Sequence, residues 1–224
     1  MKTIVFDLTT SLSNIAFPTH RVKTCDELME ICIRTCRELY SSNPLPDINI
    51  ELNTVALVIR KMTRLFFFSE NKYISIAVPI TILCNDNNFP QFYYNSTQID
   101  SEIWSWLIAM CVTPIDDLCN QEDFVEFECR CEEKGIDIKQ IYKTFKDADY
   151  GYLRYDIDLD GARNAKEKGR PHLHPQYHCD IHLSNYATFK TGFTNSISPS
   201  DFIEFLDNES DRWYIIPVKK LHKR

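Results

Sequence analysis

The sequence predicts an α+β fold in which helices pack on one face of a mixed, mainly antiparallel sheet. Residues 48–84 are rich in β-branched and aromatic side chains, which is typical of strands. Helical patterns occupy 25–41 and much of 101–147, whereas two alternating segments between 153 and 184 are joined by a polar loop that favours antiparallel pairing. The 224 residues are expected to form one domain over 1–224, with a weak boundary near 95–101.

The N-terminal half is expected to contain one strand, one helix and a strand-rich segment. Residues 3–8 read as a strand, and 25–41 form an amphipathic helical pattern. INIELN (48–53) reads as a strand, ALVIRKMTRLFFF (56–68) fits either a strand or a helix, and KYISIAVPITILC (72–84) fits a strand pair or one strand broken at Pro79. Residues 85–95 are expected to be a loop, whose aromatic run packs on the core or, alternatively, forms a recognition surface.

Helices dominate the pattern after residue 100. Residues 101–112 begin with a predicted cap at Ser101, a second helix over 121–134 is expected to stop at Gly135, and a third spans 137–147. Strands are expected again at 153–160, 177–184 and 188–193. A helix over 201–210 should start from Ser198 and Pro199, 213–218 reads as an edge strand, and the basic tail 219–224 as a solvated terminus.

Composition limits the classes of function. The net charge of −7 argues against a general nucleic-acid coat protein, although it leaves room for a local basic groove. Nine scattered cysteines are expected to be reduced thiols in the cytoplasm, and Cys129-x-Cys131 to be structural, with a zinc half-site as the alternative. The apolar run at the N-terminus is too short for a signal peptide, and no segment reaches the ~20 apolar residues of a membrane span.

The candidate site lies within residues 152–206. Apolar residues alternate there with polar ones, so each predicted strand has one apolar and one polar face. If the two strands pair and share a core, acids and imidazoles face each other on the same side of the sheet. Such a group is the ligand set of a divalent metal, manganese, magnesium or zinc. The predicted metal ligands are Asp156, Asp158, Asp160, His174, His178, Asp180 and His182.

Two other interpretations compete for these residues. A one-sided antiparallel sheet always shows polar residues at alternate positions, but aspartates on one strand face repel each other unless a cation or an arginine lies among them. The run Asp156-x-Asp158-x-Asp160-Gly161, with Glu167 at the twelfth position, also matches a calcium loop. Strand-like residues precede this run and no helical pattern follows it, which argues against an EF-hand.

The chemistry expected of this site is metal-dependent phosphodiester or nucleotide chemistry, of the nuclease or nucleotidyl-transfer type. The metal would position phosphate oxygens and activate a water or hydroxyl group. His178 and His182 would serve as ligand or general base, and Arg154 would orient a phosphate. The expected partner is therefore a nucleic acid or a nucleotide.

The Asp-x-Asp strand by itself resembles the catalytic strand of nucleotidyltransferases and archaeo-eukaryotic primases, although their other motifs are absent.

A broader resemblance runs from residue 154 to 206. The combination Arg-x-Asp-x-Asp, His-Pro-x-x-His and Ser-Pro-x-x-Phe-Ile-x-Phe resembles an uncharacterised bacterial domain family associated with accessory genes of mobile and phage-defence loci. The residues that carry it are Arg154, Asp156, Asp158, His174, Pro175, His178, Ser198, Pro199, Phe202, Ile203 and Phe205.

That resemblance implies a defence or toxin–antitoxin setting without implying an activity. The rival hypothesis is therefore a non-catalytic binding module, a partner or inhibitor subunit in such a system. Its aspartates and histidines would form a structural hydrogen-bond network, and its partner would be a protein encoded nearby. Absence of metal uptake and a stable protein complex would distinguish this hypothesis from the enzyme.

Overall fold

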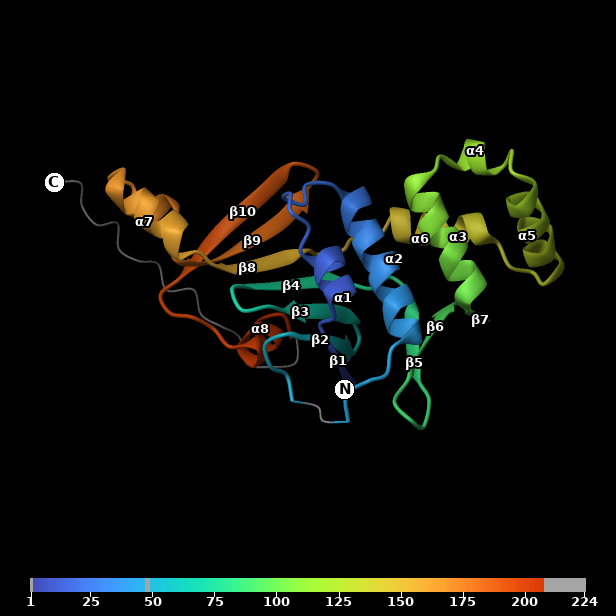
Figure 1. The fold of residues 1–224 in the computed structure, drawn as a ribbon, viewed down its shortest axis with the longest axis horizontal. Coiled ribbons are helices and arrows are strands. Elements are labelled where there is room, and N and C mark those ends of the chain that lie inside the picture. The colour runs from blue at the N-terminus through green and yellow to red at the C-terminus, as the bar shows by residue number, and fades with distance from the viewer. Residues whose placement is uncertain (1, 47–48, 208–224) are drawn as a thin grey trace.

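A seven-stranded antiparallel sheet forms the centre of the protein in the computed structural model, which describes residues 2–46 and 49–207 (Figure 1). Its strand order is β1-β2-β3-β4-β8-β9-β10, and each neighbouring pair is antiparallel. The strands of this sheet are β1 (Lys2–Asp7), β2 (Thr54–Ile59), β3 (Arg64–Phe68), β4 (Lys72–Ala77), β8 (Leu153–Ile157), β9 (Tyr177–Ser184) and β10 (Ala187–Phe193).

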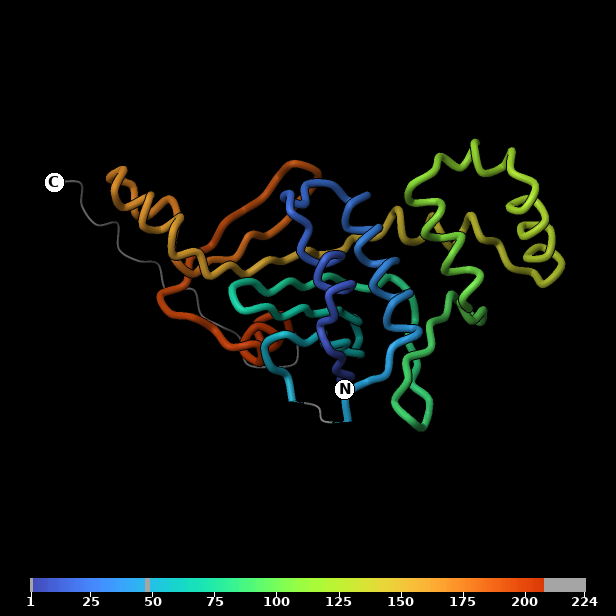
Figure 2. The backbone as a smooth tube through the Cα atoms, in the orientation of Figure 1, coloured from blue at the N-terminus to red at the C-terminus, as the bar shows by residue number. Residues whose placement is uncertain are grey.

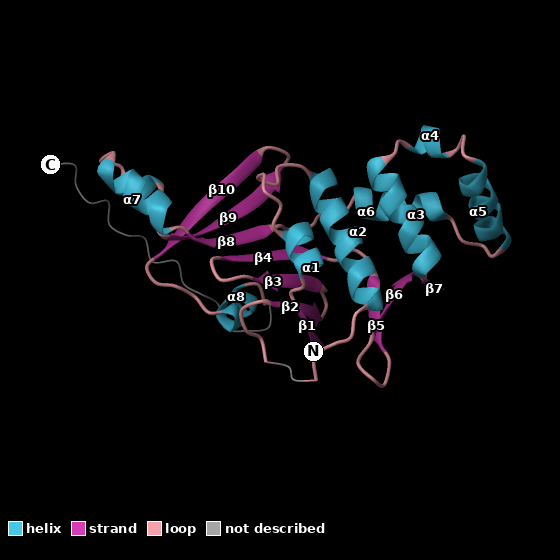
Figure 3. Ribbon diagram, in the orientation of Figure 1, coloured by secondary structure: helices cyan, strands magenta, loops and turns pink. Residues whose placement is uncertain are grey.

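A smaller sheet and most of the helices complete the α+β fold (Figure 3). The second sheet has the order β5-β6-β7, and helices α3–α6 lie beside it at one end of the molecule. The remaining elements are β5 (Thr81–Cys84), β6 (Pro90–Tyr94), β7 (Thr97–Gln98), α1 (Thr10–Ala16), α2 (Cys25–Ser41), α3 (Ser101–Val112), α4 (Ile115–Leu118), α5 (Glu122–Glu133), α6 (Ile138–Lys146), α7 (Leu159–Glu167), the 3₁₀ turn η1 (Pro171–Leu173) and α8 (Pro199–Phe205).

The main sheet is covered on both faces. Helices α1 and α2 cross one face, where Val55 and Leu57 of β2 join a large hydrophobic cluster that continues into α3–α6. Helix α8 packs on the opposite face, where Ala56 and Val58 contact a smaller cluster around Phe202. Because β2 and β3 are buried on both faces, their residues form continuous apolar runs rather than alternating ones. This explains why 56–68 fitted a strand and a helix equally well.

Local signals explain the best-predicted helix. Helix α2 begins after Thr24, whose hydroxyl accepts from Glu27 N while the Glu27 carboxylate accepts from Thr24 N. This capping box fixes the start that the apolar periodicity indicated. Helix α3 also has the expected bounds, but its cap is Asp100, whose carboxylate accepts from Glu102 N and Ile103 N, and Ser101 is the first helical residue.

Two expectations for the backbone of the N-terminal half are wrong. Residues 49–53 form no strand, because the chain turns there with Asn53 at a φ of 63°. The expected loop 85–95 contains β6, since Phe92 is buried in the large cluster and pairs with Ile82. Helices α1 and α4 were not predicted. The strand expected at 213–218 and the tail at 219–224 lie outside the described residues.

The segment after β8 differs most from expectation. The predicted strand 153–160 ends at Ile157, and the predicted polar loop contains helix α7. The Asp158 carboxylate accepts from Gly161 N, so Asp158 is the N-cap of α7 rather than the next residue of a strand. A helix over 159–167 also excludes the calcium-loop interpretation, because that loop must wrap around its ion.

Candidate metal centre

The candidate site lies on the pairing of β8 with β9, at the end of the sheet away from α3–α6. The expected antiparallel pairing is present, with Asp156 opposite His178 and Arg154 opposite Asp180. Directly opposite residues in antiparallel strands point to the same face of the sheet. Arg154 also lies opposite Ile74, a member of the large cluster, so the site occupies the face covered by α1 and α2.

Asp156, His178 and Asp180 converge below the surface. One ligand atom from each lies within 4.8 Å of the others, and no other group of this kind is found among the described residues. The three residues are only 7%, 1% and 3% exposed, respectively. They lie on the floor of an open pocket of ≈ 430 Å³, whose rim includes Arg21, Lys72 and Lys190. Two acids and an imidazole can hold a divalent cation.

Arg154 joins the two carboxylates. Its Nε donates to Asp156 Oδ2 at 2.8 Å and its Nη2 to Asp180 Oδ2 at 2.7 Å. These contacts occupy one oxygen of each acid. Although burial alone would lower it, the neighbouring acids raise the pKa of Arg154 above its ordinary value. In this structure Arg154 therefore holds the two carboxylates, and its expected role in orienting a phosphate stays a prediction.

The orientation of His178 is fixed by one hydrogen bond. Its Nδ1 lies 2.8 Å from the carbonyl oxygen of Pro175 and must carry the proton there, because a carbonyl can only accept. Burial lowers the pKa of His178 below its ordinary value, which favours the neutral ring. The lone pair of Nε2 then faces Asp156 Oδ2 at 3.5 Å. A backbone carbonyl behind an imidazole is the usual support of a metal-bound histidine.

Two glycines make room for this arrangement. A Cβ at Gly192, opposite His178 on β10, would lie 2.6 Å from Pro175 Cγ. A Cβ at Gly161 would lie 2.4 Å from Asp158 Oδ2 and from His174 Nε2. A side chain at either position would force these neighbours to shift, and both positions lie beside the candidate site. Neither residue stands out in the sequence for this role, since close approach between distant segments leaves no local pattern.

Asp158 and His174 form a second pair in the same pocket. His174 Nε2 lies 2.7 Å from Asp158 Oδ2, and its ring centroid is 4.9 Å from that of His178. Although burial alone would raise it, the hydrogen bonds from Gly161 N and His174 lower the pKa of Asp158 below its ordinary value. The pair lines the pocket beside the cluster but is not part of the converging group.

Asp160 and His182 lie apart from the cluster. Asp160 is on α7, with a side chain 85% exposed and 3.4 Å from Arg163, so its expected place on the strand face is wrong. His182 shares the face of His178 but packs against Tyr152, with ring centroids 6.3 Å apart. Its Nε2 is buried without a hydrogen bond, and burial lowers its pKa. Neither residue lines the pocket above the cluster.

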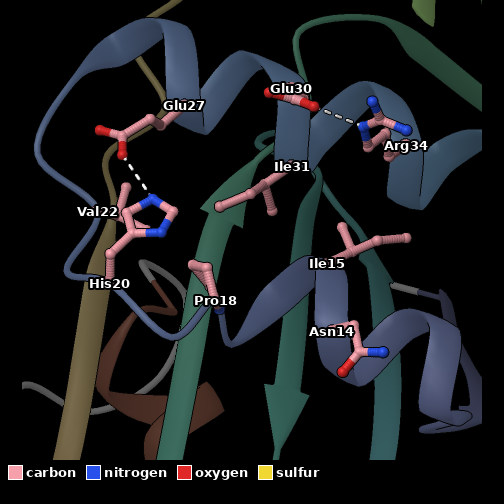
Figure 4. A pocket seen from close by; sticks show the side chains of 9 residues that line it. All are labelled: Asn14, Ile15, Pro18, His20, Val22, Glu27, Glu30, Ile31 and Arg34. Carbon is pink, nitrogen blue, oxygen red and sulfur yellow. Dashed lines mark hydrogen bonds and ion pairs between the residues drawn. The ribbon is translucent and has the colours of Figure 1, made fainter.

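A second pocket lies between α1 and α2 (Figure 4). It measures ≈ 320 Å³ and has apolar walls that include Ile15 and Ile31. Its ionisable side chains pair with one another: His20 contacts Glu27 at 2.9 Å, and Arg34 contacts Glu30 at 2.7 Å. This pocket offers no group of metal ligands.

Cysteines contribute no alternative metal site. All nine are free thiols. Cys129 and Cys131 both lie on α5, but Cys129 is exposed whereas Cys131 is buried in the core. The two thiols therefore point to different environments, and the structural interpretation of this pair fits better than the zinc half-site.

Comparisons with protein-family models, curated proteins and solved structures found no match to this chain. The resemblance to a bacterial family therefore rests on the motif residues alone. None of the helices within 2–46 and 49–207 is both long and apolar enough to cross a membrane.

Proposed function

We propose that this chain is a metal-dependent enzyme acting on phosphodiester or nucleotide substrates. Asp156, His178 and Asp180 would hold one divalent ion, and the defence or toxin–antitoxin setting follows from the motif resemblance. The observation that carries the proposal is the convergence of these three buried side chains, whose ligand atoms lie within 4.8 Å of one another. Two carboxylates and an imidazole at this spacing are a donor set that a divalent cation can occupy.

Asp180 supports the same proposal from the other side of the cluster. Its Oδ1 is buried without a hydrogen bond among the described residues, and its charged neighbour is Lys190 Nζ at 3.4 Å. A buried carboxylate oxygen without a hydrogen bond is costly, and a metal ion would satisfy it. Two carboxylates and one imidazole suit manganese or zinc, with magnesium as the harder alternative.

The metal would act as a Lewis acid on a phosphate oxygen or would activate a bound water. The chain's own contribution is to place the ligands and attract the substrate. Arg154 holds the two carboxylates at one spacing, and the Pro175 carbonyl holds the imidazole. Cations on the rim of the pocket would then contact phosphate oxygens. They are Lys72, and also Arg21 and Lys190, which approach Asp180 at 3.5 and 3.4 Å and are more exposed than Arg154.

The test is manganese binding, measured by isothermal titration after the protein has been stripped with a chelator. Asp156→Asn removes one charge from the cluster and should abolish binding. Asp160→Asn is the matched control, because it removes the same charge from the same segment at an exposed position outside the cluster. Wild-type protein that takes up no manganese, zinc or magnesium would contradict the proposal, as would equal binding by Asp156→Asn and Asp160→Asn.

A second candidate function is the non-catalytic binding module. It is favoured by one observation: three cations already surround the buried acids. Arg154 contacts both acids, and Asp180 is also approached by Arg21 at 3.5 Å and by Lys190 at 3.4 Å. Such a network could be complete without a metal. Elemental analysis showing no metal, together with co-purification of a protein expressed from the same locus, would favour this function instead.

A further inference from the structure

Helix α7 has no evident role in the core. None of its residues is buried, and it extends from the end of β8 beyond the sheet, contacting the η1 turn (Figure 2). Most helices of this length are stabilised by burying an apolar face. Helix α7 is instead held at its N-terminus by the Asp158 cap and at its C-terminus by Gly169, at a φ of 69°. The segment therefore leaves its side chains at the surface of the protein.

That surface is basic in an acidic protein. Residues 159–174 contain four cationic side chains and two acidic ones, whereas the whole chain has a net charge of −7. The four cations are exposed, and they are Arg163, Lys166, Lys168 and Arg170. Arg163 and Lys166 lie on α7, and Lys168 and Arg170 lie between α7 and η1. Lysine and arginine clustered on one segment of an acidic chain indicate a local site for an anion.

A pocket on this surface adjoins the candidate metal centre. It measures ≈ 230 Å³, and its lining combines polar and apolar residues: Gly161, Asn164, Ala165, Lys168, Arg170, Leu173 and His174. His174 lines both this pocket and the one above Asp156, His178 and Asp180. The two pockets are therefore adjacent, with cations beside each of them.

We infer that the substrate of the proposed site is a single-stranded polynucleotide whose chain runs from the metal centre past His174 to Lys168 and Arg170. This inference rests on the proposed function and specifies its substrate class. One phosphate would lie at the metal centre, and a neighbouring phosphate would contact Lys168 and Arg170. A mononucleotide would fill the first pocket only. A single strand should be preferred over a paired duplex, because the ligands are buried at the floor of the pocket.

The experiment measures binding of labelled oligothymidylate and oligouridylate of roughly twelve nucleotides, within the usual site sizes of single-strand binders. Fluorescence anisotropy is recorded in chelator, so that binding is measured without metal-dependent turnover. Lys168→Ala/Arg170→Ala is compared with Lys143→Ala/Lys146→Ala, which removes two exposed cations from α6 at the other end of the molecule. Circular dichroism checks that both variants are folded.

Wild-type protein and the α6 variant should bind the oligonucleotides alike. Loss of two phosphate contacts in the Lys168→Ala/Arg170→Ala variant should reduce the slope of log affinity against log salt by about 1.4. Equal salt slopes in the two variants, tighter binding of duplex, or equal affinity for thymidine monophosphate would overturn the inference. The proposed function is tested separately by manganese titration. Binding that depends on Lys168 and Arg170 but occurs without metal uptake would contradict the proposed enzyme and would still support an oligonucleotide-binding surface here.

Discussion

Arg154 is the residue on which the buried acids most depend. Its side chain is 18% exposed and contacts both Asp156 and Asp180, whose side chains are 10% and 4% exposed. Arg154→Met keeps the length of the side chain and removes the charge. The two carboxylates are then left with Lys190 and Arg21, whose side chains are 31% and 48% exposed and reach only Asp180, at 3.4 and 3.5 Å.

Removing one partner of a buried ion pair costs about 3–5 kcal/mol. The two peripheral cations still compensate part of the charge on Asp180, so we expect the lower end, about 3 kcal/mol in the free energy of unfolding. For a chain of this size, that loss lowers the melting temperature by roughly 6–12 °C. Manganese should still bind the variant, because the metal would supply the positive charge that Arg154 gave to the two carboxylates.

The assay is urea denaturation followed by circular dichroism, with and without manganese. Arg130→Met is the matched control, since Arg130 pairs with Glu102 at 2.6 Å on the surface, where both side chains are about half exposed. That variant should lose at most about 1 kcal/mol. Manganese at a hundredfold excess over its dissociation constant should restore about 2.7 kcal/mol to Arg154→Met. An Arg154→Met cost no larger than that of Arg130→Met, or no recovery with metal, would refute the reasoning.

Two further predictions concern His178. Gly192→Ala places a Cβ against Pro175, which should move the carbonyl that orients His178 and weaken manganese binding by about ten- to a hundredfold; unchanged affinity in the titration would show that this support is dispensable. Burial lowers the pKa of His178 below its ordinary value of 6.5. In chelator, the unfolded chain therefore takes up the proton more readily than the folded chain. The free energy of unfolding should be unaffected above pH 6.5 and should fall as the pH drops from 6.5 toward the folded pKa. In urea denaturation, His178→Gln should lose less stability than wild type as the pH falls below 6.5. An equal loss in the two proteins would show that other groups cause it.

Parts of the fold could be predicted from short-range patterns. Helix α2 was predictable because its capping box and its apolar stripe lie within the same seventeen residues. The pairing of β8 with β9 was predictable because both strands alternate and are close in sequence. Strands β2 and β3 resisted prediction, because they are covered on both faces and their alternation disappears. Helix α7 was missed because three alternating aspartates resemble a strand, although Asp158 is also a good helix cap.

The sequence by itself determined which residue types gather near 152–184 and that their polar faces would meet. It did not determine which of them converge. Tertiary structure selected Asp156, His178 and Asp180, and it placed Asp160 on an exposed helix and His182 against Tyr152. The reason is physical: strand register fixes which side chains lie opposite one another, but burial, the position of Arg154 and the close approach of Pro175 to Gly192 depend on segments that meet only in the folded chain.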